Sequence, residues 1–234
     1  MLHKCIFCFF FSLTLCAGAV WAGDVEDGIT AYLKKDYATA LKKYRNAAAQ
    51  GNAEGQYNLA IMYEDGKGVA QDYAEAMLWY KLAAAQGNAS AQFNLSLMYQ
   101  LGKGVAKDYV EAVRLYKLAA AQGIAKAQYN LGASYDNGIG VAQDYAEAVR
   151  WYKLAAAQGY PDAQNNLGVM YDMGQGVMQD VKRSHMWFNL AAIRGDINAA
   201  KGRDFMAAKM TQQQITEAQK LAKECQARNF KNCD

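Results

Sequence analysis

The chain has 234 residues, of which 53% are hydrophobic, so it can bury a core and is not an intrinsically disordered protein. Its 25 basic and 22 acidic residues leave a net charge of +3, which is too balanced to indicate a nucleic-acid partner or an anionic membrane surface. Proline occurs once, and this favours helices.

The first 22 residues have the three parts of a secretory signal peptide. Lys4 precedes an apolar stretch, and the segment ends in the small residue Ala22. An uncleaved anchor is the alternative, but the stretch is short for a membrane span of about 20 apolar residues. A lipoprotein signal at Cys16 is disfavoured by Leu15 before it. We expect cleavage after Ala22, a periplasmic or secreted protein, and no stable membrane insertion after cleavage.

Two of the five cysteines, Cys225 and Cys233, remain after this cleavage. In an oxidising compartment such a close pair indicates a disulfide bond. A redox or metal site is the alternative. However, the sequence has no C-x-x-C motif, and His185 is the one histidine outside the signal segment. We therefore expect a disulfide and neither a metal nor a cofactor.

An internal repeat dominates the rest of the chain. The tripeptide Ala-Gln-Gly ends at four glycines spaced 36 residues apart: Gly51, Gly87, Gly123 and Gly159. The complete units are residues 52–87, 88–123, 124–159 and 160–195. Residues 23–51 form a shorter unit without the internal glycine loop, and residues 196–234 follow the last copy. Such atypical ends are expected of caps.

Each unit is predicted to form two helices. The first covers about residues 53–64, where Leu59 and Tyr63 are spaced for one apolar face. The second begins after Asp72, whose side chain can cap the helix, with Glu75 completing a capping box. In the C-terminal segment, a helix is expected from Asp196 to Met210, and Thr211 is expected to cap another.

The loop between the two helices is Gly66-Lys67-Gly68-Val69, and it recurs in each copy. No strand precedes it and no Lys-Ser/Thr follows it, so phosphate binding is disfavoured. We expect glycine to permit positive φ and the valine to return to the core. A bulky column is expected to pack against columns of small residues: Trp79, Leu115, Trp151 and Trp187.

The repeated residues resemble the Sel-1-like repeat family, a branch of the tetratricopeptide-like (TPR-like) helical repeats. The pattern is Ala-Gln-Tyr-Asn-Leu-Gly…Tyr…Gly-x-Gly-Val…Asp-Tyr…Ala…Trp-Tyr…Ala-Ala-Ala-Gln-Gly, and it is fullest over residues 127–159. The resemblance implies an all-α fold, a right-handed α–α superhelix (solenoid) of helix pairs with a TPR-like cap at residues 23–51. It also implies an adaptor that assembles protein complexes, with exported bacterial members tied to the envelope or to host interaction.

By similarity to tetratricopeptide repeats, the first helices line a concave groove that holds a protein or peptide. The corresponding residues are Tyr57, Phe93, Tyr129 and Asn165, then Glu64, Gln100, Asp136 and Asp172. Beside them runs a repeated asparagine: Asn58, Asn94, Asn130 and Asn166. An amide offers donor and acceptor, so this column either holds an extended peptide or fixes repeat stacking, and the two roles are compatible. The acids hint at a basic partner, although surface charge of this density is ordinary.

No catalytic set is evident. His185 is expected to be an exposed residue of a second helix, and Ser184 beside it does not face it. Asp136 and Asp172 could approach as paired carboxylates, but no sugar-stacking pocket is implied. A cysteine-rich, β-lactam-binding branch of the family has a cysteine pair in every repeat, and this chain has none there. We predict an exported interaction scaffold, not an enzyme; the alternatives are a peptidoglycan-binding protein and, less favoured, a β-lactamase-like hydrolase.

Overall fold

The computed structural model describes residues 23–233, and within them every regular element is an α-helix. Residues 23–33 are helical, and further helices follow. Their bounds are α2 Tyr37–Ala49, α3 Ala53–Asp65, α4 Tyr73–Ala85, α5 Ala89–Leu101, α6 Tyr109–Ala121, α7 Ala125–Asn137, α8 Tyr145–Ala156, α9 Pro161–Met173, α10 Val181–Ala192, α11 Ile197–Ala208 and α12 Gln212–Ala227. The predicted all-α fold is confirmed. The predicted signal segment lies outside the described residues.

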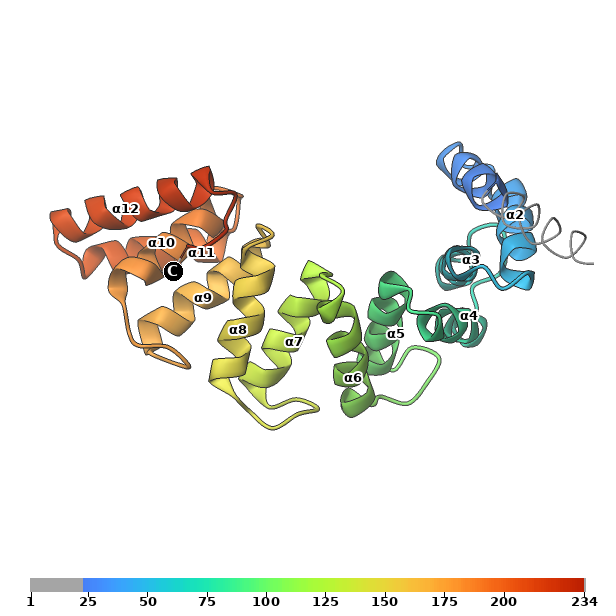
Figure 1. Cartoon of the computed structure of the whole chain (residues 1–234), viewed down its shortest axis with the longest axis horizontal. Helices are drawn as coiled ribbons and strands as arrows, with labels where there is room; N and C mark the ends of the chain where they lie inside the picture. Colours follow the sequence, from blue (N-terminus) through green and yellow to red (C-terminus); the bar gives the residue numbers. More distant parts are fainter. Residues whose placement is uncertain (1–22, 234) are drawn as a thin grey trace, which may run out of the picture. The chain divides into compact units, whose positions relative to one another are not determined.

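The chain divides into two units, one ending at Lys107 and the other beginning at Asp108. In the first unit, α2 packs on α3, α3 on α4 and α4 on α5. In the second, each helix from α6 to α10 packs on the next, and α12 packs on α10 (Figure 1). Consecutive helices are therefore neighbours in space, which is the arrangement of a helical solenoid.

The second helices begin at aspartate caps, as predicted. The carboxylate of Asp72 accepts hydrogen bonds from the backbone N–H groups of Ala74 and Glu75 at 2.9 and 3.1 Å. The other half of the predicted capping box is wrong, because the backbone N–H of Asp72 donates to the carbonyl of Tyr63 at 3.0 Å. This bond ties the start of α4 to the end of α3 and leaves the box glutamate free for other contacts.

The equivalent glutamates form ion pairs along their own helices. Glu111 pairs with Arg114 at 2.7 Å, and Glu147 pairs with Arg150 at 3.1 Å. In the last repeat, where arginine replaces the glutamate, Arg183 pairs with Asp180 at 2.6 Å. This departure from the repeat pattern therefore leaves the aspartate cap of α10 in place.

The glycine loop is explained by backbone geometry. Gly68 has φ +70°, and a Cβ at this residue would lie 2.7 Å from the carbonyl oxygen of Tyr37. Val69 packs against the core formed by α2 and α3. The loop is therefore a tight turn that returns the chain to the core, as the sequence predicted.

The bulky residues that meet the small ones lie one position after those predicted. A Cβ on Gly132 would lie 2.7 Å from the Tyr152 ring, and one on Gly168 would lie 2.6 Å from the Phe188 ring. Tyr152 is fully buried, whereas Trp151 is partly buried. Adjacent helix residues point about 100° apart, so a one-residue difference moves the contact to another face.

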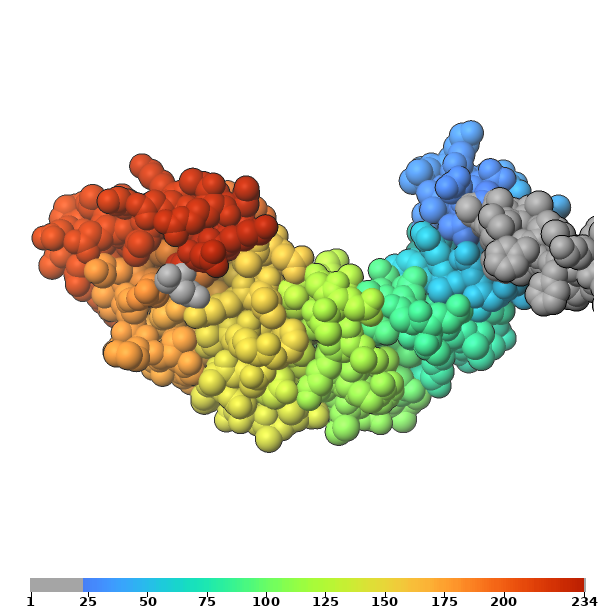
Figure 2. Space-filling model, in the orientation of Figure 1, coloured from blue at the N-terminus to red at the C-terminus, as the bar shows by residue number. Residues whose placement is uncertain are grey.

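The C-terminal helices cover one side of α10 (Figure 2). His185 of α10 is 2% exposed, so its predicted exposure is wrong. Burial, and then the charge of Arg203 on α11, lower the pKa of this histidine. Its neighbour Ser184 donates a hydrogen bond to the carbonyl of Gly168 at 2.8 Å.

Two predictions for the C-terminus are confirmed. Cys225 and Cys233 form a disulfide bond across a sequence separation of 8 residues, with their Cα atoms 5.0 Å apart. Thr211 begins α12 with a full capping box completed by Gln214. Phe230, inside the disulfide loop, packs against the core of the second unit and lies 4.7 Å below the guanidinium of Arg194.

Candidate functional site

The first helices of the four complete repeats carry the predicted binding residues. All of these side chains are partly buried: Tyr57, Asn58, Glu64, Phe93, Asn94 and Gln100 in the first unit, and Tyr129, Asn130, Asp136, Asn166 and Asp172 in the second. We call the side of α3, α5, α7 and α9 that bears them the first-helix face. Each unit carries its own part of this face.

In the first unit, a buried tyrosine links two repeats. The Tyr80 hydroxyl on α4 donates to the Glu64 carboxylate on α3 at 2.8 Å and accepts from the Asn94 amide on α5 at 3.0 Å. Burial and the charge of Glu64 hold the pKa of Tyr80 far above its usual range. The hydroxyl therefore stays protonated and joins the second helix to both neighbouring first helices.

The second unit repeats this arrangement. Tyr152 donates to Asp136 at 3.1 Å and is also hydrogen-bonded to Asn166. Asn130 donates its amide to the Tyr116 hydroxyl at 3.2 Å. Burial raises the pKa of Asp136, and the hydrogen bond from Tyr152 opposes this rise. The predicted asparagines and acids thus meet through tyrosines that the sequence placed in the core.

The asparagine amides have a structural role through these bonds. The Asn94 side chain is hydrogen-bonded to Tyr57 as well as to Tyr80, so it connects α3, α4 and α5. No described residue donates to the side-chain oxygen of Asn130, which lies on a partly buried residue and keeps its acceptor capacity.

The aromatic residues of the second unit form a cluster. The Tyr129 ring lies 5.9 Å from that of Tyr152 and 5.2 Å from that of Tyr160, measured between centroids. The role of Tyr160 was not predicted from the sequence. The signal was present, because an aromatic residue stands there where the first two complete repeats have the capping asparagines Asn52 and Asn88.

A buried glutamine column was also missed. These residues donate to carbonyls of the preceding second helix: Gln56 to Ala48, Gln92 to Ala84, Gln128 to Ala120 and Gln164 to Ala156. The Gln128 side-chain oxygen accepts from Gln158 at 2.9 Å. That of Gln164 is buried without a partner, since Arg194 stands where a glutamine would donate. The sequence did carry a signal for this column, because glutamine occupies the same position in all four complete repeats.

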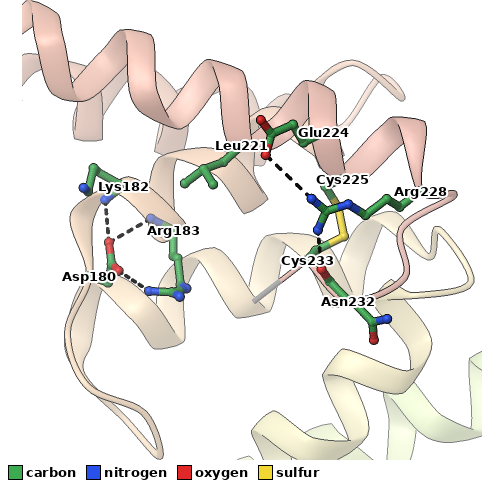
Figure 3. Close-up of a pocket in the computed structure, with 9 residues that line it drawn as sticks. All are labelled: Asp180, Lys182, Arg183, Leu221, Glu224, Cys225, Arg228, Asn232 and Cys233. Atoms are coloured by element: carbon green, nitrogen blue, oxygen red, sulfur yellow. Dashed lines mark hydrogen bonds and ion pairs between the residues drawn. A yellow bond between two sulfur atoms is a disulfide. The ribbon is translucent and has the colours of Figure 1, made fainter.

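A cavity of about 250 Å³ lies between the start of α10 and the end of α12. Figure 3 shows its lining: Asp180, Lys182, Arg183, Leu221, Glu224, Cys225, Arg228, Asn232 and Cys233. Its charges pair with each other or with neighbours, since Arg228 lies 3.8 Å from Glu224 and Lys182 lies 3.0 Å from Glu217. The cavity therefore presents no open charge for a ligand.

Residues 23–233 lack the features of two other kinds of site. No group of three or more histidine, cysteine, aspartate or glutamate side chains in this part of the chain could hold a metal ion. No helix in the same part is long and apolar enough to cross a membrane.

Known proteins share this architecture. A Sel1 repeat protein from Oxalobacter formigenes is 39% identical, with 75% of this chain and 72% of that chain covered and a TM-score of 0.72. The protective antigen c5321 of uropathogenic Escherichia coli strains, which displays an SLR fold, is 35% identical with a TM-score of 0.74. The match covers 82% of this chain but 42% of that one. A putative Sel1 repeat protein from Klebsiella pneumoniae, at 23% identity and a TM-score of 0.51, shares the fold. A search of curated proteins found no match.

A comparison with protein families matches the Sel1 repeat at residues 20–52, 53–88, 89–124, 125–160 and 161–196. These limits begin one residue later than our four complete units, and they count a fifth repeat where we expected a cap. The assignment of residues 23–51 and 196–234 as caps stays a prediction. The family matches cover well over half of the sequence. This chain belongs to the Sel1 repeat family.

Proposed function

We propose that the protein is an exported scaffold that binds an extended segment of a protein partner along its first-helix face. Sel1 repeat proteins act in general as protein-interaction scaffolds. The observation that carries the proposal is the recurring set of partly buried aromatic, amide and carboxyl side chains on the first helices of both units. Such a set supplies apolar contact and backbone hydrogen bonding at regular spacing.

The asparagines support a dual role. The amide N–H groups of Asn94 and Asn130 donate to tyrosine hydroxyls, and the side-chain oxygen of Asn130 receives no donor from the described residues. An oxygen held in place by its own amide group is an organised acceptor for a backbone N–H of a bound peptide. Stacking and peptide holding then use different atoms of one side chain.

The surroundings of Ser184, His185 and Asp136 favour binding over catalysis. Ser184 is committed to the carbonyl of Gly168, and His185 beside it is buried. The Asp136 carboxylate is held by Tyr152. No observation favours a peptidoglycan-binding protein or a β-lactamase-like hydrolase over a scaffold, so these remain outcomes that the experiment below distinguishes.

Export rests on two features. The sequence of residues 1–22, with its predicted cut after Ala22, is typical of a secretory signal. The disulfide between Cys225 and Cys233 is typical of an oxidising compartment. We place the mature protein in the periplasm or outside the cell.

Site-specific photo-crosslinking in the intact cell envelope tests the binding face. A photoreactive phenylalanine replaces Phe93 on α5 or Tyr129 on α7, and in control proteins it replaces Leu82 on α4 or Leu118 on α6. Both leucines are 42% exposed, so they report on the second helices. The proposal expects one protein partner, identified by mass spectrometry, from Phe93 and Tyr129 only. Crosslinks to the same partner from Leu82 and Leu118 alone, or to glycan alone, would refute it.

A further inference from the structure

The second unit has an aromatic pair that the first unit lacks. Tyr160 lies before α9 and contacts Tyr129 on α7, with ring centroids 5.2 Å apart and planes inclined by 45°. Both side chains are partly buried, so the pair keeps accessible ring surface. In the first unit, Tyr57 takes the place of Tyr129, but Asn88 stands where Tyr160 would be.

Two carboxylates flank this pair. Asp136 accepts the hydroxyl of Tyr152, whose ring lies 5.9 Å from that of Tyr129, and the side chain of Asp162 is hydrogen-bonded to Tyr160. Burial, and then the charges of Asp162 and Asp136, raise the pKa of Tyr129. Neither acid forms an ion pair with any residue of the described chain. Arg194, whose guanidinium lies beside Gly159, donates to the carbonyl of that residue at 2.7 Å and lies over the Phe230 ring, and it forms no ion pair with either acid.

The equivalent acid of the first unit is neutralised. Glu64 accepts the Tyr80 hydroxyl, and the Lys103 ammonium lies 3.4 Å from its other oxygen. Two repeats with the same design therefore differ in charge. The first unit supplies its own cation, and the second unit leaves its carboxylates without one.

We propose that the surface formed by Tyr129, Tyr160, Asp136 and Asp162 binds a lysine or arginine side chain from a basic segment of the protein partner. This inference rests on the proposed function and adds the chemistry of the partner. Aromatic faces attract cations, and the attraction grows when carboxylates stand beside the rings. A neutral or acidic segment gains neither contribution.

Direct titration with synthetic peptides tests this chemistry. The probe is a fluorescein-labelled Ser-Gly-Lys-Gly-Lys-Gly-Ser peptide, followed by anisotropy at low salt, and its twins carry arginine, glutamine or glutamate at the two lysine positions. We expect the lysine and arginine peptides to bind at least about tenfold more tightly than the glutamate twin, and to weaken as salt rises. Equal affinity for all four peptides, or no binding of any, would overturn the inference.

Two variants locate the site. Tyr160→Asn installs the capping residue of Asn88, whose side chain accepts from the N–H of Ala91 at 2.8 Å, so α9 keeps a helix cap. Asp162→Asn removes a charge. We expect each to weaken the lysine peptide about threefold to tenfold with no loss of melting temperature. The control is Ile124→Asn, the same change at the start of α7, which should leave binding unaltered. Unaltered binding in both site variants would refute this location.

The crosslinking and the peptide titrations together distinguish failure of this inference from failure of the proposed function. If partner crosslinks map to the first helices and the lysine peptide fails to bind, the scaffold function stands and the basic partner is excluded. If the crosslinks themselves map to the second helices, the proposed function fails. A chito-oligosaccharide that binds more tightly than the lysine peptide, and loses affinity in Tyr160→Asn, would overturn the inference in favour of a glycan.

Discussion

The hydroxyls of Tyr80 and Tyr152 join each second helix to the first helices on either side. Each is buried, donates to an acid and is hydrogen-bonded to an asparagine of the next repeat. A buried polar group that loses its partner costs about 1–3 kcal/mol, so these hydroxyls make the stacking selective for the correct neighbour. Phenylalanine at either residue would fill the same space but would leave the acid and the asparagine without this link.

Tyr152→Phe should therefore lower the free energy of unfolding by about 1–2 kcal/mol, because Asp136 and Asn166 lose their partner. The same change at Tyr145, whose hydroxyl has no hydrogen bond within the described residues, is the control and should cost less than about 0.5 kcal/mol. Urea unfolding of both variants measures the difference. Equal costs would show that the hydroxyl link contributes nothing.

Alkaline pH should destabilise the fold through buried tyrosines. Burial raises the pKa of Tyr44 from its model-compound value of 10.0 to about 12. Its folded pKa exceeds its unfolded pKa, so its stabilising contribution is complete below pH 10.0 and is lost as pH rises toward about 12.

One such group changes stability by at most about 1.4 kcal/mol per pH unit within this window. Urea midpoints at pH 8, 10 and 11 should therefore fall less steeply in Tyr44→Phe than in the wild-type protein. Tyr109→Phe, at an exposed tyrosine, is the control. An unchanged slope in Tyr44→Phe would contradict this account.

Sequence patterns predicted residues whose role is local and missed those whose role depends on a neighbour in space. The aspartate caps and glycine turns follow from a few adjacent residues, so the helix pairs were predictable. His185 is buried because α11 and α12 pack on α10, and no local pattern reports that contact. Tyr160 contacts a helix from the preceding repeat, so its role became visible in three dimensions.

At the scale of elements, the buried glutamines join each first helix to the second helix before it. Gln128 and Gln164 both donate to a carbonyl at the end of the preceding second helix, at 3.1 and 3.3 Å. They differ at the side-chain oxygen, which has a donor in Gln128 and none in Gln164. The repeats are therefore alike in geometry but unequal in hydrogen bonding.

This inequality predicts unequal mutational costs. Gln128→Met should lower the free energy of unfolding by about 1–3 kcal/mol, because Ala120 and Gln158 both lose a partner. Gln164→Met also removes a buried oxygen that has no partner, so its cost should be at least about 1 kcal/mol smaller. Urea unfolding compares the two variants. A larger cost for Gln164→Met would contradict the assignment of bonds.

For the whole molecule, the two ends of the array are stabilised differently. The second unit ends in a disulfide loop that brings Phe230 to its core and beneath Arg194, which also donates to the carbonyl of Gly159 at 2.7 Å. The one disulfide of the described residues lies in this unit. The family, the repeat period and the cysteine pair were predictable from the sequence. The packing of the disulfide loop against the core of the second unit was not.

Removing the disulfide with Cys225→Ser and Cys233→Ser together should destabilise the second unit by about 2–3 kcal/mol, on the chain-entropy view of a short loop. Reductant should lower the melting temperature of the wild-type protein and leave that of the double variant unchanged. This second comparison separates the cross-link from the packing of the cysteine side chains. If full reduction left the melting temperature of the wild-type protein unchanged, the disulfide bond would not contribute to stability.

The central claim is that the first-helix face binds the partner, and calorimetric titration of the crosslinked partner segment, made as a peptide, tests it most directly. The peptide is titrated into Phe93→Ala and Tyr129→Ala, and into the second-helix controls Leu82→Ala and Leu118→Ala, all at equal stability by urea unfolding. The account predicts at least about tenfold weaker binding for the first pair, which is about 1.4 kcal/mol, and wild-type affinity for the controls. Wild-type affinity in the first pair together with weakened binding in the controls would contradict it.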